Sequence, residues 1–159
     1  MTPTLLGRIQ TRLILFFFIG LPITFIFALG QAGWRFDWSE MRVFFVFLIC
    51  ILVVGLILDP VYILIQRFRW DRDWPFAFQF LFSIVEFLIV LGIAAIGFLP
   101  FLDAMTTVEK GANVPPGFNA LTPTIHFILV FIPSFLALLG PISLFAIRWR
   151  FKAGQLGKM

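Results

Sequence analysis

The chain has 159 residues, of which 61% are hydrophobic and 13% are charged. Soluble domains carry roughly 25% charged residues, so this charge content and a mean hydropathy of +1.04 exclude an ordinary soluble domain. The net charge of +4 indicates membrane orientation and lipid head-group contact, with no nucleic-acid partner. One cysteine and one histidine exclude an intrachain disulfide and a two-histidine metal site within one chain.

Four apolar runs punctuate the sequence, at residues 13–29, 43–66, 76–99 and 125–147. A bilayer core of about 30 Å requires about 20 helical residues, so the last three runs are ample and the first is short. No run alternates apolar and polar residues as a membrane β-strand would. We therefore predict an all-α membrane protein, a four-transmembrane-helix bundle forming one domain, with an outer loop at 100–124 and a basic tail at 148–159.

The first run also resembles a secretory signal, because Arg8 and Arg12 precede it and small residues follow it. We interpret it as a retained helix. In front of the second run, Asp37 stands where the N-cap of a helix is expected.

Basic residues in short loops predict the orientation. The amino-terminal segment, the loop 67–75 and the tail carry most of them, whereas the other two loops carry only Arg35, Arg42 and Lys110. We expect both termini on the cytoplasmic side of a bacterial inner membrane or a thylakoid-like membrane. The tryptophans support these boundaries, since all of them fall at the predicted interfaces: Trp34, Trp38, Trp70, Trp74 and Trp149.

The second and fourth runs end alike, because Asp59-Pro60 and Arg67 can be laid over Gly140-Pro141 and Arg148 at a constant offset. One interpretation is a tandem repeat of two helical hairpins, as in some transporters. The other interpretation is that arginine and aromatic residues are common wherever a helix ends at the cytoplasmic face of a membrane.

Small residues predict where helices pack closely in lipid. In the first run they recur every four residues, and the fourth run carries two more. The predicted packing residues are Gly20, Thr24, Ala28, Ala137 and Gly140.

Polar residues form matching stripes on the second and third runs and predict an intramembrane polar seam between them. Its members are Asp59, Tyr62, Gln66, Gln79, Ser83 and Glu86. Lys and Arg are absent from the four runs, so we expect Glu86 to be protonated and hydrogen-bonded to a polar neighbour. Three roles stay open for Glu86: a titratable group in a proton or ion path, a neutral hydrogen-bonded acid that fixes helix register, or an acid paired with a neighbouring subunit.

His126 stands at the outer edge of the fourth run. It is either an axial ligand to a haem or chlorophyll or a polar group at head-group level, and no other cofactor and no metal is predicted. Cys50, well inside the second run, is expected to be a packing residue.

Phosphate-binding loops, dinucleotide fingerprints, zinc-protease motifs and nucleophile elbows are absent from the sequence, so we expect no enzymatic activity. Our first hypothesis is an anchor, accessory or assembly subunit of a larger membrane complex. Its partners would be lipid, other membrane subunits or a cytoplasmic protein at the basic face, and a homo-oligomer fits as well. The basic face comprises Arg67, Arg69, Arg72, Arg148, Arg150 and Lys152. The alternative is a small proton or ion channel or transporter that uses Glu86 and Asp59.

Overall fold

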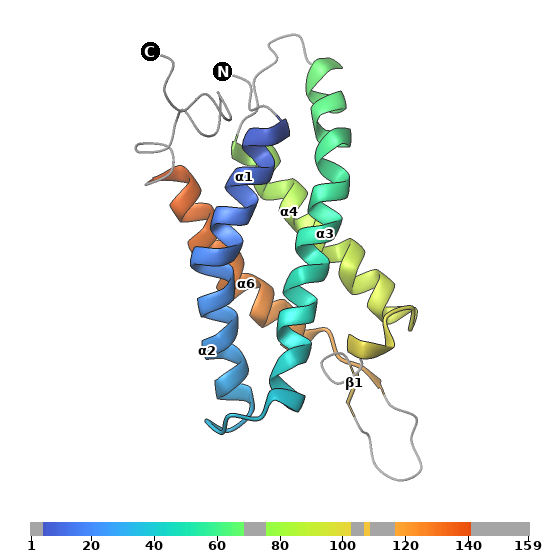
Figure 1. The fold of residues 1–159 in the computed structure, drawn as a ribbon. Coiled ribbons are helices and arrows are strands. Elements are labelled where there is room, and N and C mark those ends of the chain that lie inside the picture. The colour runs from blue at the N-terminus through green and yellow to red at the C-terminus, as the bar shows by residue number, and fades with distance from the viewer. Residues whose placement is uncertain (1–4, 69–75, 103–106, 109–116, 141–159) are drawn as a thin grey trace.

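The computed structural model describes residues 5–68, 76–102, 107–108 and 117–140 (Figure 1). Within these ranges four helices are long and apolar enough to cross a membrane, namely Leu5–Gln31, Trp38–Ile65, Phe78–Ala95 and Leu121–Leu139. This confirms the prediction of a helical bundle with four membrane-length helices. The sides on which the termini lie and the tandem repeat stay predictions.

The first membrane-length helix consists of α1 (Leu5–Leu15), the π-helical turn η1 (Phe16–Gly20) and α2 (Leu21–Gln31). It begins well before residue 13, where the sequence analysis placed the start of the span. Arg8 and Arg12 therefore lie inside this helix and not in a loop before it.

The π-turn η1 holds one residue more than an α-helical turn, since the backbone N–H of Leu21 donates to the carbonyl of Phe16, five residues back. Pro22 follows directly; a proline has no N–H to donate and its ring crowds the carbonyl four residues earlier. The wider turn relieves that crowding. An extra residue also rotates the rest of the helix by about 100°.

This rotation decides which face of α2 packs inside the bundle. Without it, Gly20 and Thr24 would point well away from the face that carries Arg12. In the structure Gly20, Thr24 and Ala28 are all buried. The predicted stripe of small residues thus faces the interior of the same chain.

The second helix, α3 (Trp38–Phe68), begins at a cap. Asp37 Oδ1 accepts hydrogen bonds from the Ser39 backbone N–H at 2.9 Å and from the Ser39 hydroxyl at 2.6 Å. These bonds hold the pKa of the Asp37 carboxyl below its usual range. The predicted helix start at this point is confirmed.

The third helix, α4 (Phe76–Ala95), ends before residue 99, where the sequence analysis placed its end. Gly97 adopts a φ of +77°, which favours glycine. The N–H groups of Gly97 and Phe98 then donate back to the carbonyls of Ala94 and Ile93. This is the hydrogen-bond pattern of a glycine-terminated helix.

The predicted outer loop contains regular structure of its own. It holds the 3-10 turn η2 (Pro100–Leu102) and the antiparallel pair β1 (Thr107–Val108) and β2 (Gly117–Phe118). The last helix, α6 (Leu121–Leu139), starts before residue 125. Its predicted continuation to residue 147 lies outside the described residues.

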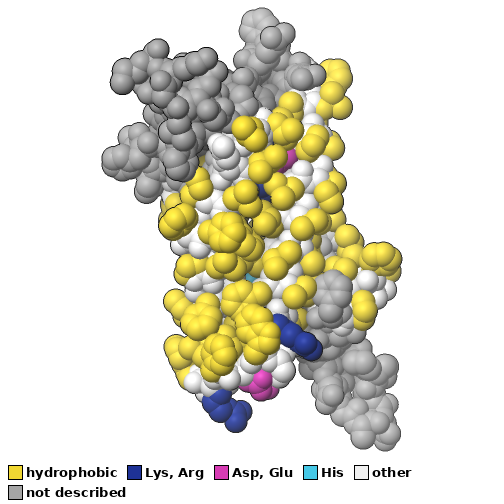
Figure 2. Space-filling view, viewed as in Figure 1, with side chains coloured by type: hydrophobic (Ala, Val, Ile, Leu, Met, Phe, Trp, Pro, Cys, Tyr) yellow, Lys and Arg dark blue, Asp and Glu magenta, His cyan; other side chains and the backbone are white. Residues whose placement is uncertain are grey.

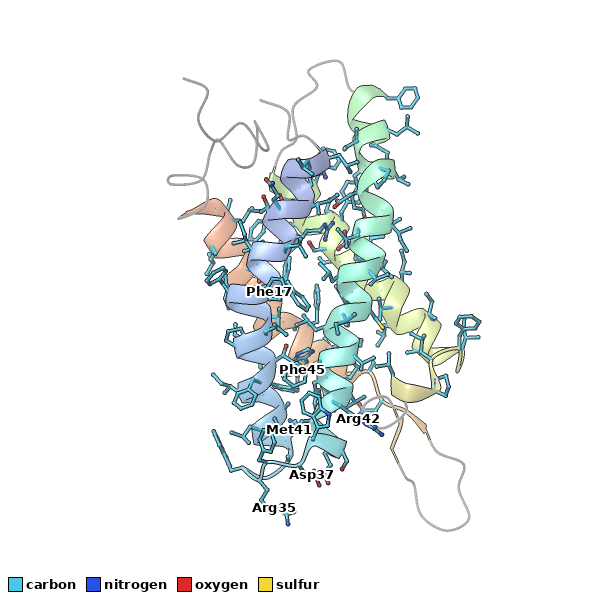
Figure 3. All side chains as sticks on the ribbon, viewed as in Figure 1. Phe17, Arg35, Asp37, Met41, Arg42 and Phe45 are labelled. Carbon is cyan, nitrogen blue, oxygen red and sulfur yellow. The ribbon has the colours of Figure 1, made fainter. Side chains whose placement is uncertain are left out.

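The helices are arranged so that α1 begins, α3 ends, α4 begins and α6 ends at one end of the bundle (Figure 1). Hydrophobic side chains are spread along the described part of the face seen in Figure 2, which suits a surface in contact with lipid. At the opposite end, where α2 meets α3, lie the charged residues Arg35, Asp37 and Arg42 (Figure 3).

The core is apolar, contains several phenylalanines and lies toward that opposite end. Phe47 is fully buried and meets Phe87 edge-to-face, and Phe87 stacks on Phe127. Met41 and Leu102 are also fully buried in this cluster. The half of the bundle nearer the start of α1 contains the polar groups described next.

Candidate functional site

The polar seam is organised by an arginine. Arg12 Nε and Nη2 donate to the two carboxylate oxygens of Asp59, at 2.8 and 3.0 Å. Its Nη1 and Nη2 donate to the two oxygens of Glu86, at 2.9 and 2.5 Å. Two bidentate pairs on one guanidinium are the strongest geometry that an arginine offers to carboxylates.

The three residues meet because they lie at similar depths in three helices. At 1.5 Å per residue, Arg12 on α1, Asp59 on α3 and Glu86 on α4 lie about 10 to 15 Å from the same end of the bundle. Asp59 and Glu86 were both predicted to belong to the polar seam, and the structure brings them together through Arg12.

Gly55 permits the contact between Arg12 and Glu86, because it lies on α3 directly against these two side chains. A Cβ at this position would lie 2.8 Å from Glu86 Oε2 and would also collide with the Arg12 guanidinium. The absence of a side chain therefore lets Arg12 and Glu86 meet over the α3 backbone.

A second arginine balances the charge. Arg8 Nη1 lies 3.9 Å from Asp59 Oδ1, so two arginines face two carboxylates. We call Arg8, Arg12, Asp59 and Glu86 the charge cluster. The side chains of Asp59 and Glu86 are 1% and 2% exposed, against 23% for Arg12. Charges buried this deeply persist only when paired and hydrogen-bonded, as these are.

The expectation that Glu86 has no internal cation is wrong, because Arg12 donates to both of its carboxylate oxygens. It failed because Arg12 was assigned to a loop outside the first span. The first run is short for a span that needs about 20 residues, and this was the signal that the helix extends back through Arg12.

The remaining seam residues lie around the charge cluster. Tyr62, Gln79 and Ser83 line a cavity of about 50 Å³ together with the cluster. The Ser83 hydroxyl donates to the Gln79 carbonyl at 2.9 Å, and the Tyr62 ring lies 4.1 Å from that of Phe82. The side chain of Gln66 lies outside the described residues.

A larger cavity of about 130 Å³ lies on the other side of Arg12 and Glu86. It is bounded by α1, η1, α3, α4 and α6 and shares Gln79 and Ser83 with the smaller one. Its far wall includes His126 on α6. The Arg12–Glu86 pair therefore stands between two cavities.

His126 does not lie at the outer edge of its helix, and that prediction is wrong. Because α6 starts at Leu121, His126 is more than a turn inside and is fully buried. Its Nε2 shares a hydrogen bond of 2.9 Å with the Thr24 hydroxyl, and the rings of Phe27 and Phe47 lie 5.2 and 5.8 Å away. Haem or chlorophyll ligation by His126 stays a prediction, and ligation through Nε2 would require this atom to leave Thr24.

The other predicted residues divide between described and undescribed segments. Ala137 is half-buried on α6, and the N–H of Gly140 donates to the carbonyl of Leu136 at the end of that helix. Cys50 is a half-buried free thiol. The side chains of the predicted basic face lie outside the described residues: Arg67, Arg69, Arg72, Arg148, Arg150 and Lys152.

Within the part of the chain that the structure describes, three or more metal-binding side chains do not gather anywhere. Comparison of the chain with protein-family models, with curated proteins and with solved structures finds no match. The function therefore has to be argued from the charge cluster and its cavities.

Replacing Arg12 tests whether the charge cluster holds the bundle together. Arg12→Met leaves two buried carboxylates that face only Arg8, so we expect a loss of about 3 to 5 kcal/mol in the free energy of unfolding. The triple variant Arg12→Met/Asp59→Asn/Glu86→Gln removes both buried carboxylates together with Arg12 and keeps Arg8, whose long side chain can reach the membrane surface from the start of α1, so it should recover much of that loss. Unfolding in detergent by denaturant measures both. Equal stability of the single and triple variants would contradict the assignment.

Gly55→Ala tests the close approach across α3. The added Cβ has to push apart Arg12 and Glu86, and we expect a loss of about 1 to 3 kcal/mol, as for other overpacked sites. Gly92→Ala on α4 is the matched control, because a Cβ there meets no atom within 4 Å. Alanine is the better helix former, so Gly92→Ala should leave the thermal midpoint unchanged or raise it. Equal effects of the two substitutions would refute the role of Gly55.

Proposed function

We propose that the chain is a non-enzymatic integral membrane subunit that serves as an anchor, accessory or assembly component of a larger complex. The observation that carries the proposal is that the charges of the cluster are paired with one another within this chain. A polar seam that served a substrate path would need access to water, whereas Asp59 and Glu86 are almost fully buried against Arg12. Their role is then to fix three helices in one register.

The surfaces left for function are the lipid-facing exterior and the ends of the bundle. We propose that both termini lie on the cytoplasmic side, where the basic face attracts anionic lipid or an acidic partner. The membrane would be a bacterial inner membrane or a thylakoid-like membrane. This proposal requires no cofactor.

Gentle extraction in native lipid followed by native mass spectrometry tests the proposal. We expect additional subunits at a fixed ratio to this chain. Arg148→Gln/Arg150→Gln/Lys152→Gln should reduce retention of a partner at the basic face, because it removes half of the face's charges. Arg35→Gln/Arg42→Gln, at the other end of the bundle, should not. A bare monomer or homo-oligomer in every extract would defeat the proposal.

The second candidate is a small proton or ion channel or transporter that uses Glu86 and Asp59. It is favoured by the two cavities on either side of the Arg12–Glu86 pair. Each cavity exceeds the roughly 10 to 15 Å³ that holds a water molecule, and each has polar walls. Separation of the Arg12 and Glu86 side chains would join the two cavities.

Proton flux in liposomes tests the second candidate. Glu86→Gln removes the acid between the cavities and keeps the Arg12–Asp59 pair, so the fold is retained. If the candidate is right, flux through the wild type exceeds that of empty liposomes, and Glu86→Gln abolishes it. Glu40→Gln, an exposed acid in the first turn of α3, is the matched control and should conduct normally. Absence of wild-type flux, or unchanged flux through Glu86→Gln, removes the candidate.

A further inference from the structure

The larger cavity has the size of one six-membered ring. Its volume of about 130 Å³ is close to the roughly 150 Å³ of an engineered protein cavity that binds benzene. Unlike that cavity, which is apolar and dry, this one has polar groups in its wall. An occupant has to be small and must satisfy hydrogen bonds.

Part of the wall is aromatic, and the rest of its apolar surface is aliphatic. Phe127 and Phe131 on α6 lie stacked with ring centroids 5.1 Å apart and planes 9° from parallel, and both line the cavity. Phe16 lines it from η1. Such walls accept a planar ring by offset stacking or by edge contact.

The polar groups in the wall lie toward two ends. Arg12, Gln79 and Ser83 line the end beside the charge cluster, and His126 lies in the aromatic half. Ser134 follows His126 by eight residues on α6, about 12 Å along the helix axis at 1.5 Å per residue. A ring that carries an oxygen on each of two opposite edges, with one hydrogen bond to each oxygen, spans a distance of the same order as the separation between His126 and Ser134.

Two polar atoms at these ends have hydrogen-bonding capacity left. His126 is fully buried, and its Nδ1 has no hydrogen-bond partner among the described residues. A buried polar atom in this state is rare and calls for a ligand or a water. Arg12 donates four of its five N–H groups to the carboxylates of Asp59 and Glu86, which leaves one N–H group on Nη1.

Charge decides between a neutral and an ionic occupant. The charge cluster is balanced, with two arginines against two carboxylates, so the cavity offers no net charge to an ion. A neutral ring with opposed oxygens is favoured. We propose that this cavity binds the head group of a quinone or quinol from the membrane, with one oxygen toward His126 Nδ1 and the other toward Arg12 and Ser134.

Equilibrium uptake by the full chain in lipid nanodiscs tests the proposal. The probe is decyl-substituted 1,4-benzoquinone, and decylbenzene is the control, because it has the same ring and chain but lacks the oxygens. We expect uptake above that of empty nanodiscs to saturate at about one quinone per chain, and no excess of decylbenzene. Absence of excess quinone, or equal uptake of the two probes, would overturn the proposal.

Matched variants locate the bound probe. Val130→Phe fills the cavity from α6 and should abolish the excess uptake. Val53→Phe makes the same change at a side chain that is 46% exposed on α3 and should bind as the wild type does. Ser134→Ala removes one hydroxyl with little change in volume and should weaken binding roughly fivefold. If Val130→Phe fails to fold, Ser134→Ala decides, and unchanged binding by either folded variant refutes the site.

Discussion

A guanidinium and two carboxylates buried in a bilayer have to form ion pairs, because the free-energy cost of burying any one of these charges unpaired is too high. Arg12 meets this requirement for Asp59 and Glu86 at once, and in doing so ties the first helix to the next two. The absent side chain of Gly55 gives it room. Lipid provides no hydrophobic drive for helix association, so this bridge and the close packing of small residues carry a large share of the specificity.

The bundle is divided into two halves of different character. One half contains the charge cluster and the smaller cavity; the other is an apolar core rich in phenylalanine, in which the buried polar pair is His126 and Thr24. The larger cavity spans the boundary between them. This division bears on the channel candidate, because a tightly packed apolar core blocks a water path through that half of the bundle. It also bears on quinone binding, because a cavity that ends at the core can still hold a membrane-soluble ring.

The four helices were predictable because each is built on an apolar run far longer than chance would leave in a soluble chain. The convergence of Asp59 and Glu86 was also predictable, since consecutive antiparallel spans place residues of equal depth side by side. Three features were not. The pairing of Arg12 was missed because a charged residue in front of an apolar run was placed outside the span, and its partners Asp59 and Glu86 come much later in the sequence. The burial of His126 depends on Thr24 from a distant helix. The end of α4 at Gly97 depends on a local backbone conformation, which hydropathy does not report.

The position of Arg12 in the chain also has a consequence for biogenesis. Synthesis proceeds from the amino terminus, so Arg8 and Arg12 emerge before either acid exists. Until α3 and α4 are made, the two arginines have only water and lipid phosphates to solvate them, and the start of α1 is held at the membrane surface by their cost of burial. Arrival of Asp59 and Glu86 removes that cost, and the first helix then settles to its full depth. The helix made first thus reaches its full depth only after α3 and α4 have been made.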